Sequence, residues 1–140
     1  MALPPLTDTL GTGWRLADDD TLGEFGMQVY LAQQLDRENA NMASAGWDGD
    51  RYAVYVNGDE EVLVLSTAWD SPVDQDEFTA AYSEYAQLKY GQQGKRSGDA
   101  SYWETPDQTA YLGWNGTNAL IILGPDRATV DKVLLATESL

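Results

Sequence analysis

The sequence of 140 residues contains no cysteine and no histidine. The absence of cysteine excludes disulfides, thiolate metal ligands and thiol nucleophiles. The absence of histidine excludes catalytic triads that use an imidazole base. Basic residues are also few, because 8 lysines and arginines stand against 23 aspartates and glutamates, which gives a formal net charge of −15. This charge repels phosphate backbones and anionic lipid surfaces, so we expect no nucleic-acid partner.

Long hydrophobic runs are missing as well. The longest apolar run, residues 119–123, is far too short to cross a bilayer, so we expect no membrane insertion. Residues 1–5 have neither the basic nor the apolar region of a signal peptide. Residues 3–6, with two adjacent prolines, are typical of a linker that enters a domain. We therefore expect residues 1–140 to be a single domain that was cut from a longer protein.

The composition that remains is that of a globular protein, with 43% hydrophobic and 22% charged residues. The charge is unevenly distributed, because residues 1–80 carry 16 acidic and 3 basic side chains, whereas residues 81–140 carry 7 and 5. One interpretation is solubility through self-repulsion. A second is a face on the N-terminal half that binds a cation or a basic partner.

Apolar periodicity and turn signals predict a mostly antiparallel sheet of about five strands packed with three helices, in the order α-β-β-α-β-β-β-α. The fold class is therefore α+β. The pattern predicts helices that begin near residues 21, 72 and 127, the first of them resuming after Asp36 as far as Ala45, and strands over residues 51–56, 62–69, 100–104, 109–114 and 119–123. Residues 91–99, with three glycines, are expected to form a flexible loop.

Local signals refine this scheme. Thr21 and Glu24 fit a capping box, and Asn57-Gly58 predicts a hairpin in which both turn residues have positive φ. Ser71 and Asp126 are candidate N-caps. The residues predicted to form the core are Phe25, Val29, Val54, Leu63, Leu65, Phe78, Tyr82, Ile121, Val133 and Leu134.

The segment Gly46–Arg51, with the sequence GWDGDR, is the first candidate site. Asp48 and Asp50 could supply oxygen ligands to Ca²⁺, but the spacing fails the EF-hand pattern. The favoured interpretation is a helix-to-strand turn in which Arg51 pairs with one of the two aspartates. The run of three aspartates at residues 18–20 is likewise interpreted as a solvated segment before a helix, where the dipole favours anions.

Two further patterns involve aromatic residues. Trp69 and Asp70 end a strand, where Asp70 could act as a catalytic carboxylate or could precede a helix cap. Trp103 and Trp114 lie on neighbouring predicted strands and could form a sugar-binding platform or could pack in an ordinary sheet. No phosphate-binding loop, dinucleotide fingerprint or Gly-x-Ser-x-Gly motif occurs.

Several motifs together resemble a known but uncharacterised module. They are Leu10-Gly11 with Trp14, DTLGE at residues 20–24, AGWDGDRY at residues 45–52, and WDSP at residues 69–72 followed by Glu77-Phe78 and Ala81-Tyr82. The module is the C-terminal accessory region of bacterial proteins that are similar to zinc peptidases. The resemblance implies a non-catalytic appendage that lacks the metal site and is exported with its parent. The element order is similar, at the level of fold alone, to the PsbP-like α/β/α sandwich.

These observations lead to three hypotheses. The first is a non-catalytic binding or assembly domain, without a cofactor, whose partner is a domain of the parent protein or another protein. Its candidate binding rim consists of Trp47, Asp48, Asp50, Arg51, Trp69 and Asp70. The alternatives are a carboxylate-based glycan hydrolase or glycan-binding module, and a calcium-stabilised structural module.

Overall fold

The computed structural model describes residues 3–115 and 117–138. Met1 and Ala2, at the start of the predicted linker, and Gly116, in the last predicted turn, lie outside the described residues. The described chain forms five helices and seven strands, in the order α1 (Thr7–Leu10), β1 (Arg15–Asp20), α2 (Gly23–Leu31), α3 (Arg37–Ser44), β2 (Trp47–Asn57), β3 (Glu60–Trp69), α4 (Pro72–Tyr90), β4 (Lys95–Ser97), β5 (Ala100–Glu104), β6 (Thr109–Asn115), β7 (Asn118–Gly124) and α5 (Arg127–Glu138).

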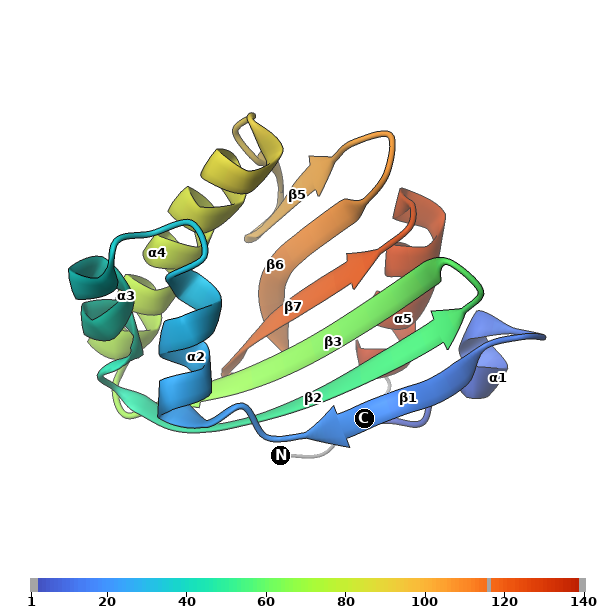
Figure 1. Ribbon diagram of the computed structural model, residues 1–140, viewed down its shortest axis with the longest axis horizontal. Coiled ribbons are helices and arrows are strands. Elements are labelled where there is room, and N and C mark those ends of the chain that lie inside the picture. Colours follow the sequence, from blue (N-terminus) through green and yellow to red (C-terminus); the bar gives the residue numbers. More distant parts are fainter. Residues whose placement is uncertain (1–2, 116, 139–140) are drawn as a thin grey trace.

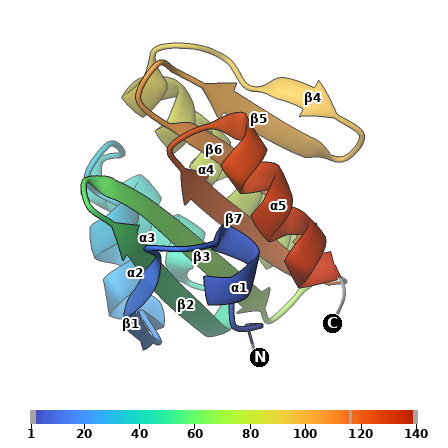
Figure 2. The same ribbon diagram turned by 90° about the vertical axis from the view of Figure 1, so that its right-hand side faces the viewer.

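The seven strands form one sheet with the order β1-β2-β3-β7-β6-β5-β4, and every neighbouring pair is antiparallel. Helices α2, α3 and α4 cover part of one face, and α1 and α5 lie on the other (Figure 1, Figure 2). Short turns join most consecutive strands, which is why the sheet is antiparallel. The predicted α+β class with an antiparallel sheet is confirmed.

Each face of the sheet has its own hydrophobic core, because successive side chains of a strand point to opposite faces. The core beneath α2, α3 and α4 contains residues such as Leu65, Phe78, Tyr82, Trp103 and Ile121. The core beneath α1 and α5 is built from a second set, which includes Leu6, Val62, Val64, Leu120, Ile122, Val130 and Val133. The continuous apolar runs of β3 and β7 therefore serve both cores at once.

The predicted starts of α4 and α5 are confirmed, and α4 ends where the predicted loop begins. Ser71 caps α4 by accepting the backbone N–H of Asp74, and Gly91 ends this helix with a φ of 69°. At the start of α5, Asp126 accepts the backbone N–H of Thr129 at 2.8 Å. The helical pattern was predicted to break at Asp36 and to resume after it. Asp36 is indeed the N-cap of α3, and its side chain accepts the backbone N–H of Asn39.

The β2–β3 hairpin is confirmed, but its turn differs from the prediction. Asn57 pairs with Glu60 in the last register position, so Gly58 and Asp59 are the two turn residues. Among the described residues only glycines have a positive φ, and Gly58 has a φ of 60°. One residue with positive φ therefore closes the turn, where two were expected.

Three elements were absent from the sequence prediction, which gave about five strands and three helices. Helix α1 has only four residues, and strand β4 has three, all exposed, within the expected loop. Strand β1 has six residues that are all exposed, and it ends in three aspartates. The two strands bury no side chain and α1 buries only Leu10, so these elements carry no periodicity that a sequence pattern could reveal.

The expected core contains two errors, both in α2. Phe25 is 76% exposed and Val29 is 50% exposed. Helix α2 instead buries Met27 and Leu31 against the sheet and the neighbouring helices. Val54, Leu63 and Leu134 are partly buried, and the other predicted core residues are fully buried.

Gly46 lies between α3 and β2 and is required there by a close approach to α4. A Cβ atom added to Gly46 would lie 2.2 Å from Cγ and 2.4 Å from Cβ of Asp74. Asp74 in turn is hydrogen-bonded to Ser71 at the N-terminus of α4. The lack of a side chain at Gly46 thus allows the end of α3 to pack closely against the start of α4. Gly46 also follows the end of α3, as predicted.

No helix within residues 3–115 and 117–138 combines the length and the apolar character needed to span a membrane.

Candidate functional site

The six residues of the predicted binding rim lie at the end of the β2–β3 hairpin that is opposite its turn. Trp47, the first residue of β2, is the register partner of Trp69, the last residue of β3. The backbone N–H of Asp70 donates to the carbonyl oxygen of Gly46 at 2.8 Å, which closes this end of the ladder. The antiparallel register therefore brings together two Trp-Asp pairs that are 22 residues apart in sequence.

Within this group, Asp50 has a structural environment that the sequence did not reveal. Its side chain is only 6% exposed and accepts the backbone N–H groups of Leu22 at 2.8 Å and Gly23 at 2.9 Å. It also accepts the indole N–H of Trp47 at 3.1 Å. A carboxylate at this position satisfies unpaired donors of α2 and faces the positive end of its dipole.

This arrangement corrects the predicted capping box. The side chains of Thr21 and Glu24 do not cap α2, whose N-cap position is Leu22. The Thr21 hydroxyl instead donates to the backbone carbonyl of Asp50 at 3.2 Å. The cap comes from a strand that follows 27 residues later in the chain, so a local motif could not identify it.

The other rim residues divide into packed and exposed groups. The indole of Trp69 stacks on Phe78 with ring centroids 4.5 Å apart, and its N–H donates to the Thr67 hydroxyl at 2.9 Å. Arg51 was predicted to pair with Asp48 or Asp50. In the structure it pairs instead with Asp19 of β1, at 3.3 Å. Asp48 and Asp70 are exposed. The rim is thus partly a structural closure of the hairpin.

The Asp50 carboxylate is bonded to the N-terminus of α2, so it is engaged there and not in a cation loop with Asp48. Within the described part of the chain, no group of three or more acidic side chains is placed to hold a metal ion. The aspartates at positions 18–20 are exposed and lie just before α2, which begins at Gly23, as predicted, but they form the end of the edge strand β1.

The predicted aromatic platform is not formed. Trp103 is 2% exposed and packs in the core beneath α4, which agrees with the alternative interpretation, packing in an ordinary sheet. Its indole N–H is buried without a hydrogen-bond partner among the described residues. The backbone of Gly94 passes over this ring, so that an added Cβ would lie 2.8 Å from it. Trp114 is half-buried and lines a groove.

This groove, here called the α4–β6 groove, lies between α4 and the strands at one end of the sheet. It has a volume of about 450 Å³. Its lining is mostly polar and consists of Asp76, Thr79, Ala80, Ser83, Arg96, Asp99, Ser101, Leu112, Gly113 and Trp114. Only Trp114 was a candidate from the sequence, because the lining combines α4 with three strands that are separate in the chain.

A second hollow, here called the α2–α3 groove, lies on the outer surface of the two short helices. It has a volume of about 300 Å³ and is lined by Phe25, Gln28, Val29, Ala32, Arg37 and Asn41. Phe25, Val29 and Ala32 are spaced i, i+4 and i+7, so they form one stripe along α2. Phe25 and Val29 of this stripe were predicted from the sequence to lie in the core.

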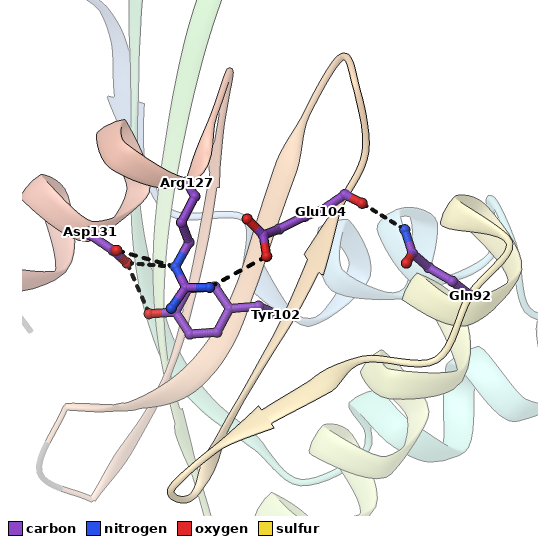
Figure 3. Close-up of polar contacts among 5 residues, drawn as sticks. All are labelled: Gln92, Tyr102, Glu104, Arg127 and Asp131. Carbon is purple, nitrogen blue, oxygen red and sulfur yellow. Dashed lines mark hydrogen bonds and ion pairs between the residues drawn. The ribbon is translucent and has the colours of Figure 1, made fainter.

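A network of polar side chains fastens α5 to the sheet (Figure 3). The guanidinium of Arg127 lies over the ring of Tyr102, 3.5 Å from its centroid, and its Nε donates to both carboxylate oxygens of Asp131 at 3.1 Å. The Tyr102 hydroxyl donates to Asp131 at 3.0 Å. Arg127 also pairs with Glu104 at 3.4 Å. Every charge in this network has a partner, which is the expected pattern for a structural tie.

Tyrosines form a cluster where α2 meets α4. The hydroxyl groups of Tyr30 and Tyr82 are hydrogen-bonded to each other at 2.7 Å, and Tyr85 packs against both rings. Burial raises the pKa of Tyr82 well above its ordinary value, so this phenol stays neutral. The cluster acts as packing between helices, because its rings contact one another and the Tyr30 and Tyr82 hydroxyls are paired with each other.

Comparison with known proteins gives one match. Residues 12–134 match the model of a family that is described as "Domain of unknown function (DUF8575)". No curated protein and no solved structure matches the chain. The match covers all seven strands, helices α2, α3 and α4, and most of α5. The chain therefore belongs to the DUF8575 family.

Proposed function

We propose that the chain is a non-catalytic docking domain that holds a basic amphipathic helix of a partner protein in the α2–α3 groove. The partner belongs either to a larger, peptidase-like parent protein or to a separate protein. The observation that carries this proposal is the exposed stripe of α2. Phe25 is 76% exposed and Val29 50% exposed although their spacing is that of a packed helix face.

The apolar part of the groove favours a helix as the bound element. The stripe of Phe25, Val29 and Ala32 offers hydrophobic contacts along about two turns of α2. A partner helix with apolar residues at the same spacing would cover this stripe. Burial of an exposed phenylalanine contributes about 2 kcal/mol, which is enough to make Phe25 the main anchor.

The groove itself is lined by one charged residue, the cation Arg37, but the charges around it are mostly acidic and favour a basic partner. Glu24 precedes Phe25 and Glu38 follows Arg37, and both acidic side chains are exposed. Strand β1, which leads into α2, ends in three exposed aspartates at residues 18–20. Residues 1–80 carry 16 acidic and 3 basic side chains. A lysine-rich partner is attracted by this field, and an acidic one is repelled.

The predicted rim fits this proposal as a support for the groove. Asp50 holds the N-terminus of α2, two residues before Phe25, and Trp47 holds the Asp50 carboxylate. Asp48 and Asp70 remain exposed, and in the proposal they extend the acidic surface toward the end of the hairpin.

The test uses two synthetic amphipathic peptides of about five helical turns. One has leucine on its apolar face and lysine elsewhere, and the other has glutamate in place of lysine. Fluorescence anisotropy should show saturable binding of the lysine peptide alone. A double variant, Phe25→Ser with Val29→Ser, should raise the Kd by roughly thirtyfold or more, because it removes about 2 kcal/mol of apolar contact.

The matched control is Leu88→Ser, which removes an apolar side chain that is 54% exposed on α4 and outside the groove. It should leave the Kd unchanged. If the lysine peptide binds the double variant as tightly as the native chain, simple attraction to a net charge of −15 accounts for the binding. The proposal would then be wrong.

A further inference from the structure

We propose that the α4–β6 groove is a binding site for a neutral saccharide. This site is separate from the α2–α3 groove and does not depend on the docking function proposed above. The proposal rests on how the sheet and helix leave space there, on which polar groups line that space, and on the balance of their charges.

The space arises because small side chains face each other across the helix–sheet interface. Ala80 and Ser83 of α4 lie on the face that also carries Asp76 and Thr79, at i, i+3, i+4 and i+7 spacing. Opposite them lies the small side chain of Ser101 of β5. The next residue of β5 on the same face is Trp103, whose large side chain fills the core. The resulting volume of about 450 Å³ falls within the range of small-molecule sites, roughly 300–1,000 Å³.

Strand register places further groups on the floor of the groove. Arg96 of β4 pairs with Ser101 of β5, and Ser101 pairs with Leu112 of β6. These three residues form a row across the sheet on the side that faces α4. Trp114 lies two residues beyond Leu112 on the same strand and also lines the groove. A guanidinium, a hydroxyl and an indole therefore border one space.

The polar groups of the groove have few partners within the described chain. Arg96 forms no ion pair there, and its hydrogen bond is a long one of 3.5 Å to the carbonyl of Gly98. The carboxylates of Asp76 and Asp99 and the hydroxyls of Ser83 and Ser101 accept or donate no hydrogen bond to a described residue. These groups are available to a ligand, unlike the fully paired network around Arg127.

This set of groups matches a ligand that is rich in hydroxyls. Carboxylates accept hydrogen bonds from sugar hydroxyls, the guanidinium of Arg96 donates to their oxygens, and serine hydroxyls can do either. An indole such as that of Trp114 packs against the apolar C–H face of a sugar ring. Two carboxylates against one guanidinium repel anionic ligands such as phosphates and sugar acids. A neutral saccharide is therefore favoured over a charged one.

The experiment titrates a panel of neutral di- and trisaccharides into the ¹⁵N-labelled chain and follows amide and indole shifts by NMR. The panel covers glucose, mannose, galactose and N-acetylglucosamine units, each added to about 10 mM, which is ten times a Kd of 1 mM. We expect at least one saccharide to cause saturable shifts of the Trp114 indole and of neighbours in the groove.

Two exposed substitutions then test the site without disturbing the core. Arg96→Gln and Asp99→Asn should each weaken binding by about tenfold, because each removes a charged hydrogen-bonding group. Lys95→Gln, at the adjacent position of β4, and Glu77→Gln, next to Asp76 on α4, are the matched controls, since neither side chain lines the groove. Both controls, and the Phe25→Ser variant, should bind as the native chain does.

Three results would overturn the proposal. One is the absence of saturable shifts with every member of the panel, while the spectrum shows a folded chain. Another is binding that Arg96→Gln and Asp99→Asn leave unchanged, since the sugar then lies elsewhere. A third is a preference for a zwitterionic dipeptide, tested in parallel at the same concentration, because Arg96 and the two aspartates would then recognise opposite charges and not hydroxyls.

Discussion

The carboxylate of Asp50 accepts the backbone N–H of Gly23 at 2.9 Å and so caps a helix that begins 27 residues earlier in the chain. The same carboxylate accepts the N–H of Leu22 and the indole N–H of Trp47. One side chain thereby joins the start of α2 to the start of β2. The exposed surface of α2 depends on this contact for its position.

We expect Asp50→Ala to lower the free energy of unfolding by about 2–3 kcal/mol, because it removes the acceptor of three donors and the anion at a helix N-terminus. Urea denaturation followed by far-ultraviolet circular dichroism measures the change. Asp48→Ala, two residues away and exposed, is the control and should change stability by less than about 0.5 kcal/mol. Equal effects of the two variants would contradict the capping role.

A second prediction concerns the tie between α5 and the sheet (Figure 3). Arg127→Lys should cost about 1–2 kcal/mol, because lysine cannot reproduce both the planar stacking on Tyr102 and the paired bonds to Asp131. Lys132→Ala on the same helix is the control. Thermal and urea unfolding check this result, and an Arg127→Lys variant as stable as the native chain would show that the network contributes little.

Tyr52 gives a prediction at alkaline pH. Its hydrogen bond to Asp18, at 2.7 Å, raises the pKa of this phenol to about 12. A raised folded-state pKa means that the contribution to stability is fully present below the unfolded value near 10 and is lost as pH rises toward 12. The stability advantage of the native chain over Asp18→Asn should therefore shrink across this interval.

Ultraviolet difference absorbance of tyrosinate and NMR of Tyr52 measure the titration directly. In Asp18→Asn the pKa of Tyr52 should move back toward its ordinary value. Asp59→Asn, at the far end of the hairpin, is the control and should leave it in place. A Tyr52 phenol that titrates near 10 in the native chain would show that the hydrogen bond to Asp18 does not persist in solution.

A fourth prediction concerns calcium. The described residues hold no group of acidic side chains arranged for a metal ion, and Asp50 is bonded to a helix terminus. The thermal midpoint should therefore be the same with Ca²⁺ and with a chelator, since an ion that binds only the folded chain must raise its stability. A rise with Ca²⁺ that the chelator reverses would restore the calcium-stabilised alternative.

Much of the fold could be predicted from local patterns. Ser71, Pro72 and Gly91 define α4, and the β2–β3 hairpin follows from Asn57-Gly58 between two apolar runs. These signals work because capping, turns and alternation depend on residues that are close in sequence. Strands β1 and β4 could not be predicted, since they pair at the sheet edges with exposed side chains only.

The candidate sites show the same division. The sequence identified Trp47, Asp50 and Trp69 as residues near one end of the hairpin, and the register confirms that Trp47 and Trp69 are paired. The role of Asp50 was missed because its partners, Leu22 and Gly23, are in a different element. The α4–β6 groove was missed for the same reason, since its lining combines a helix with three strands.

By itself, the sequence determined the α+β class, the limits of the long helix and the exclusion of thiol and imidazole chemistry, because these follow from composition and short-range spacing. Only the tertiary structure decided which face of α2 is buried. Phe25, Val29 and Ala32 have the periodicity of a packed helix face, but Met27 and Leu31 occupy the interface with the sheet. Periodicity gives the stripe, whereas the direction in which it points depends on contacts with distant segments, here the packing of Met27 and Leu31 in the core shared with α3, α4 and the sheet.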